Sequence, residues 1–171
     1  ALIGKWHLGY LQKHHPMNFG FQKFVGFKSG NVDYQSHRNR YGDVDWWDGL
    51  EMKNMPGYTT TLLTTLSEDY IKENKDKPFC LYIAHAAPHS PMQGPNEKAI
   101  RTEATLEGDK NSDRPNKEIY KDMVEELDWS VGRILETLKK YKLDKNTFVV
   151  FFSDNGPVIN NGGSTGGYRG A

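Results

Sequence analysis

The fold is decided by the stretch Thr147-Phe148-Val149-Val150-Phe151-Phe152-Ser153-Asp154-Asn155-Gly156. Its first part is apolar or β-branched throughout, which is typical of a strand buried on both faces of a sheet. A carboxylate and an amide follow at the carboxyl end of this predicted strand, where open α/β sheets place their ligands. Their oxygens suit a hard cation such as Ca²⁺ or Mg²⁺, so Asp154 and Asn155 are candidate metal ligands. Asp-Asn-Gly is also a common turn signal, and the stretch taken alone favours a simple turn.

The rest of the chain alternates helical patterns with strand patterns. Residues 19–27 predict an irregular packed loop that leads to a short strand. A helix can begin at Thr59 or Thr60, and a second buried strand is expected from Phe79 to Ala84. From Asn116 the apolar spacing predicts an amphipathic helix of about 25 residues that packs on the sheet. This order predicts an α/β fold in which helices flank a mostly parallel central sheet.

Two short segments outside the opening stretch carry candidate chemistry. Lys5 and His7 lie two residues apart between glycines, a spacing that in an extended segment sends both side chains to one side and suits an anion. A polar surface loop is the alternative there. The strand predicted from Phe79 to Ala84 is followed by the loop His85-Ala86-Ala87-Pro88-His89-Ser90-Pro91. The prolines make a helical zinc pair unlikely to form, so a single histidine aimed into a pocket is favoured, and His89 is the better held of the two.

Composition excludes several classes of partner. The chain has 171 residues, with 22 basic and 22 acidic side chains, so no global field points to nucleic acid or to an anionic membrane. No apolar run is long enough for a membrane span. One cysteine, Cys80, excludes an intrachain disulfide, and its surroundings predict a buried strand position. Both ends of the sequence resemble cuts inside a longer protein.

Three loop regions complete the chain. Residues 31–58 are rich in aromatic and turn-forming residues and predict short hairpin strands, whose aromatics either stack on a sugar ring or, as we favour, cover the edge of the core. Residues 93–116 predict a polar surface excursion. His14 and His15 are expected to be solvated. The glycine-rich residues 156–170 are a possible anion nest.

Taken together, four motifs resemble the type I sulfatases of the alkaline-phosphatase-like superfamily in order and spacing. They are Gly4-Lys5-Trp6-His7, Ala87-Pro88-His89-Ser90-Pro91, Ser153-Asp154-Asn155-Gly156 and Tyr168-Arg169-Gly170. The resemblance covers essentially the whole chain, and it implies that residues 1–171 are part of a single sulfatase catalytic domain that is truncated at both ends.

The resemblance implies a role for each candidate residue in the hydrolysis of a sulfate ester on a carbohydrate or aryl substrate. Asp154 and Asn155 would bind a divalent cation, usually Ca²⁺. Lys5 would contact the sulfate and the nucleophile, and His7 would hydrogen-bond the nucleophile. His89 would contact the sulfate and help to protonate the leaving oxygen. A cation and a lysine stabilise negative oxygens, and histidine moves protons near neutral pH.

Parts of the family pattern are absent from this sequence. The family's nucleophile is a formylglycine made from a Cys/Ser-x-Pro/Ala-x-Arg motif, which the chain lacks, since Cys80 is followed by Leu81-Tyr82-Ile83. The paired aspartates that supply further metal ligands are also missing. We therefore expect the isolated chain to lack sulfatase activity and to bind Ca²⁺ weakly.

Two alternatives to a sulfatase stay open at this point. One is a phosphodiester or phosphonate hydrolase of the same superfamily, and the other is a non-catalytic relative that binds a sulfated glycan. The resemblance also implies export of the parent protein to a periplasmic, extracellular or lysosomal space. The sequence does not indicate an oligomeric state.

Overall fold

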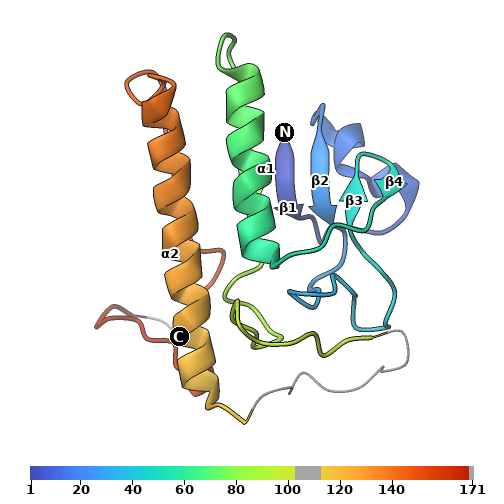
Figure 1. Ribbon diagram of the computed structural model, residues 1–171, viewed down its shortest axis with the longest axis vertical. Coiled ribbons are helices and arrows are strands. Elements are labelled where there is room, and N and C mark those ends of the chain that lie inside the picture. Colours follow the sequence, from blue (N-terminus) through green and yellow to red (C-terminus); the bar gives the residue numbers. More distant parts are fainter. Residues whose placement is uncertain (103–112, 170–171) are drawn as a thin grey trace.

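Strand β1 (Leu2–Lys5) lies between two parallel neighbours in the sheet of this computed structural model, which describes residues 1–102 and 113–169. Within these residues the other strands are β2 (Phe24–Phe27), β3 (Trp47–Asp48), β4 (Glu51–Met52) and β5 (Tyr82–Ala84). The α-helices are α1 (Thr59–Asn74) and α2 (Asn116–Lys140), and short 3-10 turns cover Gln12–His14, Pro16–Phe19 and Ile159–Asn161 (Figure 1).

The sheet has the order β4-β3-β2-β1-β5, in which β2, β1 and β5 are parallel and β5 is an edge strand. Strand β1 pairs in parallel with β2 on one side and β5 on the other, so that Lys5 lies opposite Phe27 and Gly4 opposite Ala84. Strands β3 and β4 add an antiparallel hairpin beyond β2. The predicted α/β class is therefore confirmed, and the hairpin lies in the turn-rich segment 31–58, where composition predicted one.

Gly4 explains how closely these strands approach one another. A Cβ atom placed on Gly4 would lie 2.1 Å from the Ala84 carbonyl oxygen, a distance too short for any side chain. Its φ of 121° is also a conformation that L side chains rarely adopt. Glycine is thus required at the residue that precedes Lys5, where β1 and β5 meet.

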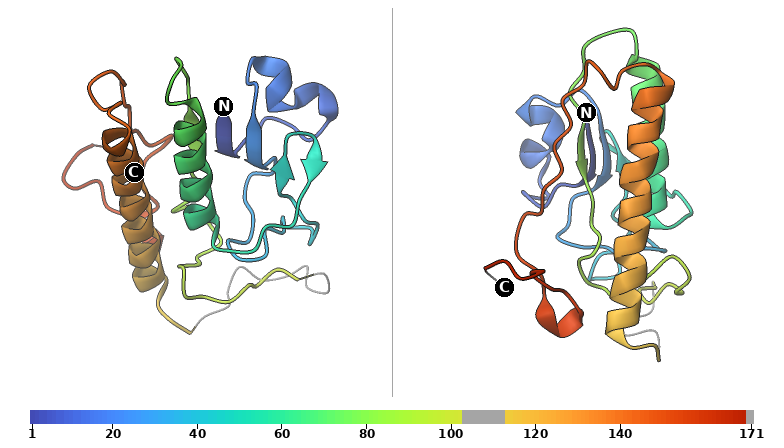
Figure 2. Two further views of the ribbon diagram at one scale, coloured as in Figure 1. Left: turned by 45° about the horizontal axis from the view of Figure 1, so that its top comes forward. Right: turned by 90° about the vertical axis from the view of Figure 1, so that its left-hand side faces the viewer.

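Both helices lie to one side of β1, with α1 between β1 and α2 (Figures 1 and 2). The main contact of α2 is with α1, through Thr64 Oγ1 and Ser130 Oγ at 2.6 Å and through the ion pair of Arg133 with Glu68 at 2.9 Å. The prediction that α2 packs on the sheet is therefore wrong. Because α2 is one helix removed from the sheet, part of its apolar stripe is exposed, at Val124, Trp129 and Leu135.

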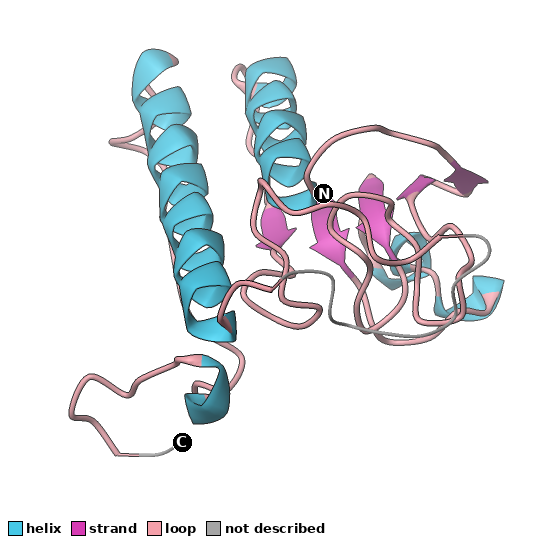
Figure 3. Ribbon diagram, turned by 60° about the horizontal axis from the view of Figure 1, so that its bottom comes forward, coloured by secondary structure: helices cyan, strands magenta, loops and turns pink. Residues whose placement is uncertain are grey.

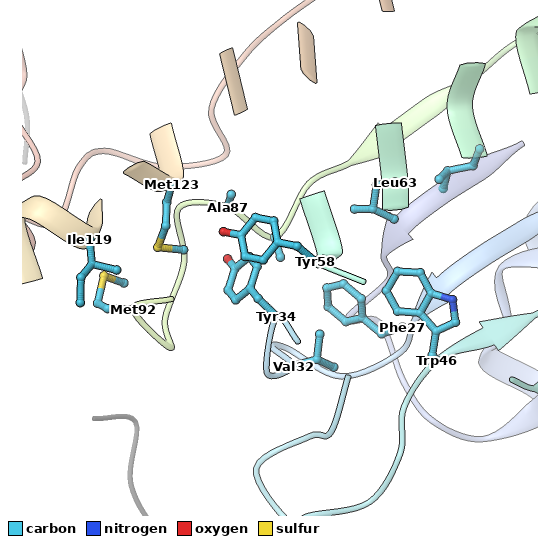
Figure 4. Close-up of a cluster of buried hydrophobic side chains, with 12 residues drawn as sticks. Phe27, Val32, Tyr34, Trp46, Tyr58, Leu63, Ala87, Met92, Ile119 and Met123 are labelled. Atoms are coloured by element: carbon cyan, nitrogen blue, oxygen red, sulfur yellow. The ribbon is translucent and has the colours of Figure 1, made fainter. Parts of the chain in front are cut away.

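The core runs from the hairpin edge of the sheet to the first turns of α2 (Figure 4). Trp46 is fully buried and lies against Phe27, with ring centroids 6.4 Å apart. The aromatics of residues 31–58 thus contribute to the core, as favoured from the sequence. Tyr34 and Tyr58 stack at 5.4 Å and extend the core toward Met92, Ile119 and Met123.

The stretch Thr147 to Phe152, predicted to be a buried strand, is neither a strand nor buried. Phe148 is 93% exposed and Phe151 is 69% exposed. The stretch forms a loop after α2, and no strand among residues 1–102 and 113–169 pairs with it (Figure 2). The apolar side chains favour burial in a sheet, but a strand also needs a neighbouring strand to pair with its backbone N–H and C=O groups.

Cys80 and His15 are two further corrections. Cys80 is exposed, because it precedes β5 at the outer edge of the sheet, although its carbonyl accepts a hydrogen bond of 2.8 Å from the amino group of Ala1. His15 is buried rather than solvated. Its Nε2 lies 3.0 Å from the Gly49 carbonyl oxygen, and its ring meets the edge of Phe24.

The predicted excursion 93–116 is partly wrong as well. The side chains of Gln93 and Arg101 are buried, so this end of the segment is tied to the core rather than to solvent. The part of the prediction that falls on residues 103–112 lies outside the described residues.

Candidate functional site

The candidate site lies at the carboxyl edge of the parallel strands. Strands β1, β2 and β5 end level with one another at Lys5, Phe27 and Ala84. The loops that follow these strands gather at the arrowhead ends in Figure 3. Lys5, His7 and His89 all lie at this edge or just beyond it, where open α/β sheets bind ligands.

Lys5 is the last residue of β1 and is half-buried. Burial lowers the pKa of its ammonium group, and the negative charge of Asp154 opposes that shift. Asp154 therefore lies close enough for its charge to act on Lys5, although the two residues are 149 positions apart in the sequence (154 − 5 = 149). The structure therefore brings the strand-end lysine and the candidate metal ligand within the range of an electrostatic interaction.

His7 has an unusual backbone conformation. Its φ of 57° is in the left-handed region, which is uncommon for residues other than glycine, although histidine adopts it more often than most side chains do. The backbone N–H of His7 donates to the Lys28 carbonyl at 3.2 Å, and that of Trp6 donates to Phe27 at 2.9 Å, so the β1–β2 pairing continues past both strands. Partial burial lowers the pKa of the His7 imidazole, and the nearby charges of Lys5 and His89 add to that effect.

His89 is exposed, and the backbone of its loop is held by hydrogen bonds from the core. The buried Tyr34 hydroxyl donates to the His89 carbonyl at 2.9 Å, and the His89 N–H donates to Ala86 at 2.9 Å. The ring Nδ1 lies 2.8 Å from the Ser90 carbonyl oxygen. A carbonyl can only accept, so Nδ1 carries a proton in this contact and Nε2 is the nitrogen left for a ligand.

Asp154 and Asn155 are both exposed at the end of the unpaired stretch. The Asn155 amide donates to the Gly156 carbonyl at 2.8 Å, which leaves its side-chain oxygen available. Two oxygen donors suit a hard cation in kind but are too few for the six to eight ligands that Ca²⁺ takes. Across residues 1–102 and 113–169 no cluster of three or more histidine, cysteine or acidic side chains could hold a metal.

His85 belongs to a different part of the molecule. Its Nε2 lies 3.3 Å from Ser130 Oγ on α2, whereas His89 lies beside His7. Burial lowers the pKa of His85 to about 4. The two histidines thus have different surroundings, one between β5 and α2 and one on the exposed loop.

Sequence reasoning missed the residues that support the site. The Asp33 carboxylate accepts backbone N–H bonds from Ile100 at 2.7 Å and Arg101 at 2.8 Å, and a bond of 3.2 Å from the Gln93 side chain. Gln93 in turn accepts from the Tyr34 N–H at 2.9 Å. These side chains join the loop under His89 to the residues after β2. No local pattern marks them, because each bond spans about 60 residues or more.

A comparison with protein families finds one that covers the chain. The family model described as Sulfatase matches residues 1–170. Among curated proteins, the N-acetylgalactosamine-6-sulfatase of Canis lupus familiaris is 32% identical over 182 aligned residues, which cover 96% of this chain and 32% of that protein. The chain therefore spans about a third of the length of the curated relatives that it matches.

Solved structures agree with the family match. The crystal structure of Ps i-CgsB superposes with a TM-score of 0.76 at 27% identity and covers 95% of this chain and 38% of its own. A second structure of that protein, in complex with k-i-k-neocarrahexaose, has a TM-score of 0.75 at 25% identity, with the same coverage of 95% and 38%. The fold of this chain thus recurs within a larger protein.

Proposed function

Because the chain belongs to the sulfatase family, we propose that it supplies part of the active site of a sulfuric ester hydrolase. The observation that carries this proposal is the meeting of Lys5, His7 and His89 at the carboxyl edge of the parallel strands, with Asp154 close to Lys5. A cluster of cationic and proton-carrying groups at this edge suits an anionic ester. The nucleophile implied by the family resemblance is absent from this sequence, so no step below depends on it.

Lys5 binds the sulfate in this proposal. A sulfate ester carries negative charge on its non-bridging oxygens, and more charge develops on the bridging oxygen as the S–O bond breaks. Lys5 stabilises both, because it is half-buried and its charge is less screened than that of a solvated lysine. Its position at the end of β1 fixes the ammonium group relative to the sheet.

His89 protonates the leaving oxygen. When the S–O bond breaks, the bonding electrons stay on the ester oxygen, which takes a proton and departs as an alcohol or phenol. The Nδ1 proton is already donated to Ser90, so the transferred proton is carried on Nε2 of the imidazolium form. His7, beside His89 and Lys5, hydrogen-bonds the attacking group.

Asp154 and Asn155 supply two ligands of a divalent cation, Ca²⁺ or Mg²⁺. The cation, when bound, would neutralise sulfate charge. The donor chemistry fits a hard cation, and the remaining ligands must come from groups other than the described acidic and histidine side chains. The isolated chain is accordingly expected to bind Ca²⁺ weakly and to lack turnover.

The substrate class that we propose is a sulfated carbohydrate. Support comes from the relative named N-acetylgalactosamine-6-sulfatase and from the neighbour structure in complex with k-i-k-neocarrahexaose. Export of the complete protein also stays a prediction. No α-helix in the described part of the chain has the length and apolarity needed to cross a membrane.

The test is steady-state turnover of an aryl sulfate and of a sulfated oligosaccharide by the complete enzyme that contains this chain. We expect His89→Ala to lower kcat by about 10²- to 10⁴-fold, the usual contribution of a general acid. His14→Ala is the matched control, because the His14 side chain lies against Gly9 in a surface turn. Unchanged turnover in His89→Ala would refute the role of His89. Turnover of phosphodiesters but not of sulfates would favour the phosphodiester hydrolase instead.

A further inference from the structure

Gly30 lies against the imidazole of His7. A Cβ atom on Gly30 would be 2.5 Å from His7 Nε2, 2.7 Å from Cε1 and 3.1 Å from Cδ2. The first two distances are shorter than real Cβ contacts, so any side chain at this position would force a rearrangement. The ring of His7 thus occupies the space that every other amino acid would need at position 30.

The backbone at Gly30 does not itself require glycine. Gly30 is not among the residues with positive φ, unlike Gly4 or Gly26. The atoms near its missing Cβ belong to a side chain, whereas those near Gly4 and Gly26 belong to backbone. Glycine at position 30 is therefore explained by the ring of His7 and not by a turn or by strand pairing.

The backbone of His7 is held against the same segment. Its N–H donates to the Lys28 carbonyl, and its left-handed φ fixes the direction in which the side chain leaves the chain. The neighbouring Trp6 is anchored separately, since its indole N–H donates to the His14 carbonyl at 2.7 Å. With the main chain held at Trp6 and at His7, the remaining freedom of the imidazole is its own side-chain rotation, which Gly30 permits in this orientation.

We propose that Gly30 is a positioning residue for His7: the absence of a side chain at position 30 lets the imidazole lie against the segment that follows β2, in the orientation that faces the site. This rests on the proposed function only for the use made of His7. The positioning itself concerns two residues of this chain and can be tested without turnover.

The first test is NMR spectroscopy of the 171-residue chain. We expect cross-relaxation between the Gly30 Hα protons and the ring protons of His7, and a pKa of His7 below the ordinary 6.5. Gly30→Ala should remove the cross-relaxation and move the pKa of His7 toward 6.5, because the ring must leave its partly buried position. Gly132→Ala is the matched control, since a Cβ on that helical glycine meets no atom within 4 Å, and it should leave the His7 signals unchanged.

The second test is a double-mutant cycle by thermal unfolding. Gly30→Ala should lower the midpoint in the original sequence but not in a His7→Ala background, where the space is free. Equal losses in both backgrounds, or a Gly30→Ala chain that stays unfolded when His7→Ala is added, would show that the backbone needs glycine and would overturn the proposal. An inactive complete enzyme would contradict the sulfatase assignment and leave both of these measurements standing.

Discussion

At the scale of single residues, the Asp33 carboxylate connects more chain segments by hydrogen bonds than the side chain of any candidate catalytic residue does. Its Oδ1 accepts N–H bonds from Gln35 at 2.9 Å and Ser36 at 2.8 Å, and its Oδ2 receives those of Ile100, Arg101 and Gln93. Burial by itself would raise the pKa of Asp33, but the backbone N–H groups together hold it below its ordinary value. The carboxylate thus replaces water for donors from three segments.

We expect Asp33→Asn to lower the free energy of unfolding by about 3 kcal/mol, because an amide keeps one acceptor and turns an NH₂ group toward buried donors. Urea denaturation measures this change. Asp48→Asn on the exposed surface of β3 is the control and should change stability by less than about 0.5 kcal/mol. A loss no larger than that of the control would show that the Asp33 network is dispensable.

At the scale of elements, a polar contact joins β5, α1 and α2. His85, just after β5, meets Ser130 on α2, and Ser130 meets Thr64 on α1. The His85 Nδ1 is buried without a hydrogen-bond partner, which disfavours its charged form. Since the pKa of His85 is about 4 in the folded chain and about 6.5 when unfolded, the unfolded chain binds more protons between these values.

Stability is therefore expected to fall as the pH drops from 6.5 to 4, by about 3 kcal/mol from His85. His85→Leu should remove that part of the pH dependence, as measured by denaturant midpoints at pH 7 and pH 4.5 or so. His14→Leu should retain it. An identical pH dependence in His85→Leu would mean that other groups cause the loss of stability.

At the scale of the whole molecule, the unusual surface is the apolar stretch from Phe148 to Phe152. Each of its side chains is at least half exposed, and none of its five residues is charged, a proline or a glycine. Large contiguous apolar surfaces and unpaired β-prone segments favour association between chains.

We expect the isolated chain to self-associate with rising concentration, as followed by light scattering or sedimentation. Val150→Lys places a charge in the middle of the stretch and should suppress this association. Val158→Lys changes an equally apolar, exposed residue outside the stretch and should not. A monomer at all concentrations would show that the stretch is covered in solution.

The same stretch shows how far sequence reasoning reaches for this molecule. The helical period predicted α1, because local burial determines that pattern. The apolar run from Phe79 predicted a buried strand, but β5 covers only Tyr82–Ala84 and none of its residues is buried, because it is an edge strand. The stretch from Thr147 has the same strong pattern and forms no strand, because pairing depends on residues that a local pattern does not contain. For the site, strand ends and motifs singled out Lys5, His7 and His89. Their supports, Tyr34 and Gly30, act through contacts between distant segments and left no signal in the sequence.

The position of β1 between β2 and β5 has a consequence for synthesis. Leu2 of β1 pairs with Tyr82 of β5, 80 residues later, so β5 cannot pair with β1 before that segment leaves the ribosome. β5 ends 57 residues after β2 (84 − 27 = 57). At about 5 to 20 residues per second, one edge of β1 therefore stays open for about 3 to 11 seconds after the other edge can pair with β2. The pairing of β1 with β5 therefore forms later than its pairing with β2, and Asp154, which follows α2, can approach Lys5 only after that.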